Sequence, residues 1–570
     1  MPGIATADYW MIGVYMLLMV AIGVYFLRFI DDIRTYYAGQ NQIPWWVAGI
    51  SFYMSGFSTY LFVAYAGRTY EWGWPAITML WAVVPAYFIA GLVFARYWRR
   101  AALISPVEFL ETRYHEGVRQ LYVWARMPVQ LIDNGARVFA LAFFVHTATG
   151  LALNTSILAC GIITLSYTLM GGLWAVTVTD VVQFIILLAA TIVLVPMSLK
   201  AVGGWSSLVA ALPEGHLQLF NQHMKPGFWL VFLAVIIVAF NSNWSLIQRF
   251  YCVPDERSAR RVGLLAGTLY IFTMPLFMFP SLVTRAMQPD LAHPDQAFVS
   301  IAREVLPAGM MGLVLAAMFA ATMSALDSEY NVLGSVLTRD VYQRFIRPRA
   351  GRRELMHAAR AATALVGVIP IVLAFVLVKR HGLFDTVLAT FGVTGGPMAV
   401  PLLGGLIYRR GTAWGAVASL VIGTGVGAGL MLGAGLPYQG YAAGSILTSI
   451  LAYVIVSELT PPSASRRRVV EAFFDRLSRP VVPPATSTTA PPSPFGIVGV
   501  ATLGLGVALA CIGLVNPQVS DRILCGTVGG ALALLGVVLT LVSICRRPDR
   551  SSIDPGSDSA MQSSTEKTLE

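Results

Sequence analysis

Long apolar runs separated by short polar segments follow one another along nearly the whole chain, from Tyr9 to Cys545. Each run is about 20 residues long, the length that an α-helix needs to cross a hydrocarbon core about 30 Å thick. About fifteen runs can be distinguished, centred near residues 18, 55, 87, 135, 162, 186, 238, 273, 322, 369, 396, 424, 450, 505 and 534. The pattern predicts an all-α polytopic membrane protein with about 15 transmembrane helices.

The basic residues predict the orientation of these helices, because Lys and Arg collect in cytoplasmic loops. With the N-terminus outside, the cytoplasmic loops and the C-terminal tail would hold 28 of the 39 Lys and Arg residues, and the outer loops would hold 8. The remaining three, Arg126, Arg137 and Arg360, fall within apolar runs. We therefore expect a multi-pass protein of the cell (plasma or inner) membrane, with its N-terminus outside and its C-terminus in the cytoplasm.

Composition excludes several other classes of protein. The chain is 56% hydrophobic and only 12% charged, whereas a soluble domain carries about 25% charged residues, so a soluble enzyme is excluded. The net charge of +10 is spread over many loops, which disfavours a nucleic-acid partner. There is no phosphate-binding G-x-x-x-x-G-K-[ST] and no H-E-x-x-H, so the sequence lacks the motifs of an ATP-driven pump or a zinc enzyme. The lipid bilayer is the expected surrounding, and no obligate protein partner is predicted.

Composition changes after the thirteenth run and predicts four parts. Residues 1–458 hold the first thirteen helices, and residues 459–494 form a linker with an amphipathic stretch followed by a Pro-rich spacer. In the amphipathic stretch we expect Phe473 and Phe474 at the lipid boundary. Residues 495–545 form two appended transmembrane helices, and residues 546–570 form a polar tail that we expect to be disordered.

Three apolar runs are interrupted by polar or small residues in mid-span. Ser51 to Thr59 contains three serines and a glycine, Asn241 to Ser245 contains two asparagines, and Ser324 to Asn331 contains two acids. Such residues are tolerated at bilayer depth only where they pack on protein or line a cavity. Broken, polar spans that meet near the midplane are typical of secondary transporters.

Four motifs carry a resemblance to the sodium:solute symporter family. The strongest is GGLWAVTVTDVVQ, residues 171–183; TYYAGQNQIPWWVAG and SPVEFLETRY precede it, and Thr338 to Tyr342 follow it in the family's order. The resemblance covers the first thirteen helices. It implies a five-plus-five inverted repeat of the leucine-transporter type, formed by helices 2–6 and 7–11, with one extra helix before the repeat and four after it.

The same resemblance implies a Na⁺ site. Backbone carbonyls at a break in the second helix, those of Met54 and Phe57, would bind the ion together with the carbonyl of Ala321 and the hydroxyl of Ser324. Na⁺ prefers oxygen ligands, and an unwound helix exposes carbonyls that a regular helix uses in its own ladder. The alternative for these small residues is ordinary close packing of membrane helices.

Two of the three acids considered next have two interpretations each, and the third is expected to be paired. Relatives have a second hydroxyl where this chain has Ala325, so Asp327, one turn from Ser324, would replace it as an ion ligand or would be a buried structural acid. Asp180 resembles the family acid on the sodium path, or stabilises a helix start through the helix dipole. Asp133 lies four residues before Arg137, which favours an internal ion pair.

The substrate pocket is expected to be lined by aromatic side chains and a few hydrogen-bonding groups: Ser55, Ser58, Thr59, Tyr60, Trp81, Asn243, Trp244 and Tyr270. Where sugar-transporting relatives have Gln, Glu, Lys and Gln, this chain has Leu61, Leu80, Tyr270 and Ala389, and only Asn243 is retained. The resemblance therefore disfavours glucose or galactose and leaves the solute open.

These observations favour a Na⁺-coupled importer of a small polar organic solute that works by alternating access. Na⁺ is the only cofactor expected. Two alternatives stay open. One is a transporter-like membrane sensor or receptor, and the other is a carrier coupled to H⁺ instead of Na⁺. An intramembrane enzyme is disfavoured because the one close acid pair, Asp327 and Glu329, would lie about 200° apart on a helix.

Overall fold

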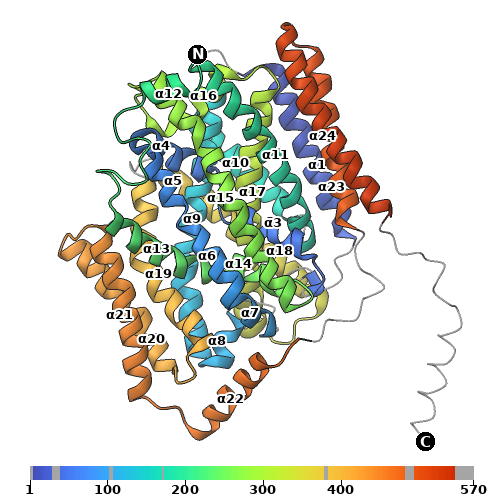
Figure 1. Ribbon diagram of the computed structural model, residues 1–570. Helices are drawn as coiled ribbons and strands as arrows, with labels where there is room; N and C mark the ends of the chain where they lie inside the picture. Colours follow the sequence, from blue (N-terminus) through green and yellow to red (C-terminus); the bar gives the residue numbers. More distant parts are fainter. Residues whose placement is uncertain are drawn as a thin grey trace, which may run out of the picture.

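The computed structural model describes residues 4–28, 39–101, 107–169, 172–377, 383–481 and 493–545, and all the regular structure of this part of the chain is helical (Figure 1). The predicted Pro-rich spacer and the predicted disordered tail lie outside the described residues. The helices of the first half are α1 Thr6–Leu27, α3 Trp45–Met54, α4 Ala66–Trp72, α5 Trp74–Leu80, α6 Val83–Ile89, α7 Ala95–Arg100, α8 Glu108–Arg113, α9 Glu116–Thr149, α10 Leu153–Thr168, α11 Leu173–Ala201, α12 Trp205–Ala211, α13 Pro226–Asn241, α14 Trp244–Tyr251 and α15 Glu256–Met287.

The second half continues the same pattern. Its helices are α16 Ala297–Val305, α17 Met310–Val336, α18 Arg352–Leu377, α19 Leu383–Ile407, α20 Ala413–Ala428, α21 Tyr438–Leu459, α22 Ala464–Ser478, α23 Pro494–Leu514 and α24 Val519–Cys545. Wider π-helical turns, η2 Leu61–Tyr65, η3 Ala90–Phe94, η5 Leu337–Ile346 and η6 Gly429–Gly433, join or extend some of them. Such turns mark sites where a helix departs from its regular ladder.

Within the described residues, eleven helices are long and apolar enough to cross a membrane, or twelve if α13 and α14, which meet at a 53° bend, form one span. The other three predicted spans are helical but differ from a simple apolar helix. The segment from α3 to α4 is broken, α10 has only 16 residues, and α9 carries charged residues along 34 residues.

Helix α17 is the centre of the molecule. Every residue from Met310 to Val336 is buried, and α1, α3, α9, α11 and α18 pack around it (Figure 1). Its sequence is rich in Ala, Gly and Ser, which let neighbouring backbones approach closely. At its start, the Asp8 carboxylate of α1 accepts hydrogen bonds from the amides of Gly309 and Gly312, both at 2.7 Å. An acid there satisfies amides that have no partner in the helix and stabilises the positive end of the helix dipole.

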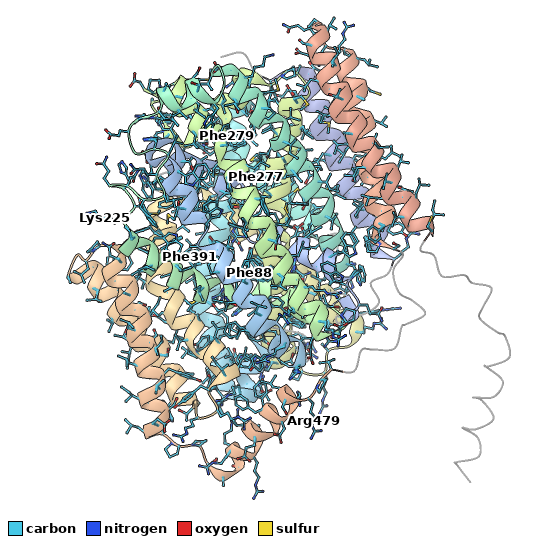
Figure 2. The ribbon with its side chains drawn as sticks, viewed as in Figure 1. Phe88, Lys225, Phe277, Phe279, Phe391 and Arg479 are labelled. Carbon is cyan, nitrogen blue, oxygen red and sulfur yellow. The ribbon has the colours of Figure 1, made fainter. Side chains whose placement is uncertain are left out.

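Labelled side chains illustrate what lies inside the helix bundle and what lies at its surface. Phe277 is fully buried and Phe391 lies inside the bundle, whereas the basic Lys225 and Arg479 lie at the periphery (Figure 2). Apolar side chains on the outer faces of the long helices are exposed, as expected where lipid is the solvent.

The two appended helices form a hairpin that packs on α1 (Figure 1). Glycines allow this contact, because a Cβ on Gly499 or Gly506 would lie within 2.7 Å of backbone atoms of α24, and one on Gly529 or Gly536 would meet α23 in the same way. Small residues at one face of paired membrane helices permit such close approach.

Helix α22 corrects the expectation that Phe473 and Phe474 face lipid. Both side chains are buried, at 3% and 7% exposure, and Phe473 packs against the Phe109 ring at 6.1 Å between centroids. Arg466, at the start of α22, donates to the backbone carbonyls of Glu111 and Thr112. The aromatic pair was expected at lipid because it forms the apolar face of an amphipathic helix, but α8 covers that face.

A charged cluster joins α8, α9 and the π-helical end of α17. Glu111 accepts hydrogen bonds from both Arg119 and Arg344, and Arg344 also pairs with Glu116 at 2.7 Å. The hydrogen bond from Arg344 and the neighbouring Arg119 lower the pKa of the Glu111 carboxyl to about 2. Because its pKa is depressed, this carboxylate stabilises the fold above its unfolded pKa, and the contribution is lost as the pH falls towards 2.

Candidate functional site

The break predicted in the second helix lies between α3 and η2. At the end of α3 the Ser55 amide donates a hydrogen bond to the Ser51 carbonyl, and the Gly56 amide donates to the Tyr53 carbonyl. The next backbone hydrogen bond runs from the Leu61 amide to the Ser58 carbonyl. The carbonyls of Met54 and Phe57 lie in this interval. Gly56 is required there, because a Cβ would come within 1.9 Å of the Tyr87 hydroxyl.

The unwound segment is held against α17. The Thr59 amide donates to the Thr322 hydroxyl oxygen at 3.1 Å, and the Thr59 hydroxyl donates to the Met318 carbonyl at 2.7 Å. The Ser55 and Ser328 hydroxyls lie 2.9 Å apart. Ala321 and Ser324 lie between these contacting positions along α17, so the stretch of α17 that carries them packs against the unwound segment.

Ser324 has the environment of an open ligand position. Its hydroxyl is fully buried, lies near the Asp180 carboxylate and, among the described residues, completes no hydrogen bond of regular geometry. A buried hydroxyl without a partner is uncommon and needs an explanation such as a bound ion or water.

Sequence reasoning missed the partner of Asp180, which is Arg249 of α14. The guanidinium Nη2 lies 3.7 Å from the Asp180 Oδ2, and both side chains are almost completely buried. Ser51 links them, because its hydroxyl donates to Asp180 and accepts from Arg249 Nε at 3.0 Å. Arg249 also donates to the Ser328 hydroxyl. Asp180 is therefore held by a charge rather than by a helix dipole alone.

Asp327 lies next to this pair. One carboxylate oxygen accepts the Thr168 hydroxyl, and the other has no hydrogen-bond partner among the described residues. Asp327 is 1% exposed and close enough to Asp180 and Arg249 for electrostatic interaction with both. With both carboxyl groups ionised, the two acids and one guanidinium would carry a net negative charge in a buried place, which a bound cation would neutralise.

Glu329 faces a different part of the interior, as the helical spacing predicts. Its carboxylate accepts hydrogen bonds from Gln130 at 2.5 Å and from the Ser245 hydroxyl at 2.8 Å. Asn243 also donates to it at 3.3 Å. This acid is satisfied by neutral donors, and nothing in the linear sequence pointed to those partners.

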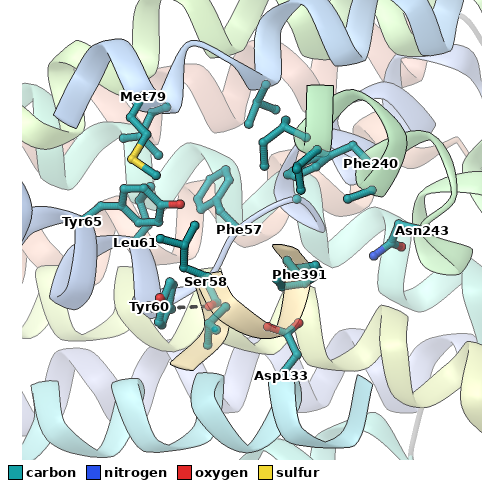
Figure 3. Close-up of a pocket in the computed structure, with 18 of the residues that line it drawn as sticks. Phe57, Ser58, Tyr60, Leu61, Tyr65, Met79, Asp133, Phe240, Asn243 and Phe391 are labelled. Atoms are coloured by element: carbon teal, nitrogen blue, oxygen red, sulfur yellow. Dashed lines mark hydrogen bonds between the residues drawn. The ribbon is translucent and has the colours of Figure 1, made fainter. Parts of the chain in front are cut away.

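A cavity of about 150 Å³ lies beside the break (Figure 3). Five of the eight predicted pocket residues line it: Ser55, Ser58, Tyr60, Asn243 and Tyr270. Leu61 and Leu80, two of the positions that are polar in sugar transporters, line it too, and Ala389 does not. The predicted Asp133–Arg137 ion pair is confirmed, at 2.7 Å, and both residues belong to the cavity wall.

Three predicted pocket residues lie elsewhere. Thr59 is turned to α17, the Trp81 indole donates to the Ile271 carbonyl at 3.1 Å, and Trp244 is buried under the Arg126 guanidinium. Asn243 lines the cavity, but its amide oxygen caps α14 by accepting from the amides of Ser245 and Leu246. Asn followed by a polar helix start is an N-cap signal that the sequence did contain.

The chain matches a known protein family. The profile of the Sodium:solute symporter family matches residues 36–423. A sodium/glucose cotransporter 4 from Danio rerio is 26% identical, over 73% of this chain and 71% of the relative. A sodium/glucose cotransporter from Vibrio parahaemolyticus is 25% identical, over 74% of this chain and 84% of the relative.

The fold is also found among solved structures. A Na⁺-coupled sialic acid symporter in a substrate-bound, outward-open state superposes with a TM-score of 0.72 at 21% identity, covering 80% of this chain and 99% of that one. The sodium/sialic acid symporter of Proteus mirabilis is 23% identical, over 79% of this chain and 94% of the relative.

Proposed function

Because the chain belongs to the sodium:solute symporter family, we propose that the break after α3 and the facing stretch of α17 hold the coupling Na⁺ of this importer. The protein is a Na⁺-coupled solute symporter of the membrane and not an enzyme. Met54, Phe57 and Ala321 would supply carbonyls, and Ser324 a hydroxyl. The observation that carries the proposal is the buried Ser324 hydroxyl, which lies beside the Asp180 carboxylate on the part of α17 that packs against the unwound segment.

Asp327 would complete the ion site in place of the hydroxyl that Ala325 lacks. The Asp327 carboxyl oxygen that has no hydrogen-bond partner among the described residues, and the nearby Asp180 carboxyl, would favour a cation. Asp180, linked through Ser51 to the break, would guide the ion toward the cytoplasm. A carboxylate pair also admits a proton in place of Na⁺, which is the H⁺-coupled alternative.

The membrane topology and the domain boundaries belong to the same proposal. With fifteen crossings, the five-plus-five repeat would comprise helices 2–6 and 7–11, and the N-terminus would lie outside and the C-terminus in the cytoplasm of a cell membrane. Residues 1–458 would be the transport domain, 459–494 a cytoplasmic linker and 495–545 an appended hairpin. With this orientation the Glu111 cluster would lie on the cytoplasmic side.

The driving force is sufficient for accumulation. One Na⁺ moving down about 100 mV releases about 2.3 kcal/mol, and a tenfold gradient adds about 1.4 kcal/mol. One-to-one coupling therefore supports a gradient of about 500-fold in the solute. The cavity residues Ser55, Ser58, Tyr60 and Tyr270 would contact the small polar organic solute. Thr59, Trp81 and Trp244, which the sequence also assigned to the pocket, would act from outside the cavity wall.

The proposal predicts that purified protein in proteoliposomes accumulates solute only with a Na⁺ gradient. Labelled glucose, sialic acid and neutral amino acids form the panel, and external Na⁺ is compared with equimolar K⁺ at a fixed potential. We expect at least tenfold faster uptake of one panel member with Na⁺. Equal uptake driven by a proton gradient without Na⁺ would support the H⁺-coupled alternative instead.

A further inference from the structure

One ion pair stands in the wall of an otherwise uncharged cavity. Among the residues that the structure describes, Asp133 and Arg137 are its only charged lining residues, and they come from successive turns of α9. Figure 3 shows Asp133 extending toward Phe391, and Tyr60, Leu61 and Asn243 stand around the same space. A charged pair at bilayer depth is costly and is retained where it meets a substrate, an ion or another charge.

The pair leaves one atom of each partner for a ligand. Arg137 Nη2 donates to Asp133 Oδ2 at 2.7 Å, whereas Arg137 Nη1 is buried and has no hydrogen-bond partner among the described residues. The Asp133 side chain is 19% exposed, so its second oxygen can be reached from the cavity. Arginine binds carboxylates through two parallel donors, and only one of these is used here.

The surroundings do not supply those missing partners. The nearby charges are Arg126 and Glu329, and Glu329 is already satisfied by Gln130 and Ser245. Two guanidinium groups and two carboxylates leave the cluster neutral. A solute without net charge can therefore enter without leaving an uncompensated buried charge.

The rest of the wall is apolar and aromatic. Phe57, Phe240, Phe391 and Tyr438 contribute rings, and the Tyr438 hydroxyl is buried without a partner among the described residues. A cavity of about 150 Å³ matches the size at which an engineered apolar cavity admits benzene. It suits the apolar body of a small molecule, whereas a sugar would leave several hydroxyls against Leu61 and Leu80.

We propose that the transported solute is a small zwitterion with an apolar body, a neutral α-amino acid being the type. Its carboxylate binds Nη1 of Arg137, its ammonium binds the open oxygen of Asp133, and its side chain lies among the aromatic rings. This inference rests on the proposed function, since it names the substrate class of the same transport site. Arg137 and Asp133 are its specificity-determining residues.

The test is Na⁺-driven uptake in proteoliposomes of alanine, valine, leucine and proline, beside the deaminated counterparts propionate, isovalerate and isocaproate. Isobutylamine and isoamylamine, glucose and sialic acid complete the panel. We expect at least one amino acid to enter at least tenfold faster than its monocarboxylate and its amine. Uptake of glucose, sialic acid or a monocarboxylate alone would overturn the inference, as would the absence of amino-acid uptake by protein that binds ²²Na⁺.

Two variants test the assignment of each head group. Arg137→Lys keeps the positive charge but loses the two parallel N–H donors of the guanidinium. We therefore expect the KM for the amino acid to rise at least tenfold, with unchanged ²²Na⁺ binding. Asp133→Asn should reduce the preference for the amino acid over its monocarboxylate at least tenfold. Arg360→Lys, an exposed arginine of α18, is the matched control. An unchanged KM and unchanged preference in both variants would contradict the assignment.

Failure of the inference and failure of the proposed function give different results. If Na⁺ drives uptake of a panel member that is not an amino acid, the symport function stands and the zwitterion is wrong. If no panel member responds to Na⁺ and ²²Na⁺ does not bind, the proposed ion site fails as well.

Discussion

Arg249→Met is expected to lower the free energy of unfolding by about 3–5 kcal/mol, because it leaves the Asp180 carboxylate buried without its counter-charge. Arg249 is completely buried and donates to Ser51, Gln248 and Ser328 as well as facing Asp180. Removing it breaks a network that joins α3, α11, α14 and α17. Equilibrium unfolding in mixed micelles, at fixed Na⁺ concentration, measures the change.

The double variant Arg249→Met, Asp180→Asn separates the charge from the packing. With the carboxylate neutralised, we expect a large part of the lost stability to return, because an unpaired buried charge no longer remains. Arg360→Met, at an exposed position of α18, should change stability by less than about 0.5 kcal/mol. A double variant that is no more stable than Arg249→Met would show that the Asp180–Arg249 pair is not what the network stabilises.

Asp327→Asn is expected to raise the Na⁺ concentration for half-maximal uptake at least tenfold, a cost of about 1.4 kcal/mol or more in Na⁺ binding. The carboxylate has one oxygen without a hydrogen-bond partner among the described residues and lies near Asp180, so a cation is its natural partner. The Asn variant keeps the shape and loses the charge. A Na⁺ titration of uptake at saturating solute measures the effect.

Acidification gives an independent check of the same residue. Protonation of Asp327 in the parent protein should imitate the substitution, so the Na⁺ requirement should rise at low pH in the parent and change much less in the Asn variant. Asp290→Asn, in an exposed loop, is the control. Unaltered Na⁺ and pH dependence in Asp327→Asn would leave Asp327 as a structural acid that Thr168 holds in place.

Local sequence signals located the irregular membrane segments. The serine-rich and glycine-containing run gave the break after α3, and the Asn241 to Ser245 run falls where α13 and α14 bend. The spacing of Asp133 and Arg137 predicted their ion pair, because residues four apart share a helix face. These features are determined by neighbours along the chain, which is why one sequence was enough.

Contacts between distant segments could not be predicted in the same way. Asp180 and Arg249 lie on different helices, and no local pattern pairs them; the same holds for Glu329 with Gln130. Trp81 and Trp244 were assigned to the pocket from their residue type, although the face that each presents depends on how its helix is rotated. The lipid-facing interpretation of Phe473 was wrong because the sequence of α22 does not reveal that α8 covers it.

Equilibrium ²²Na⁺ binding to the purified protein tests the ion site most directly, because it needs no knowledge of the solute. The parent protein should bind Na⁺ saturably and not exchange it for K⁺, and Ser324→Ala should bind at least tenfold more weakly. Ser419→Ala removes another buried hydroxyl without a partner among the described residues, on α20 and outside the proposed site, and should bind as the parent does. Equal Na⁺ affinity in the parent and in Ser324→Ala would contradict the placement of Na⁺ between α3 and α17.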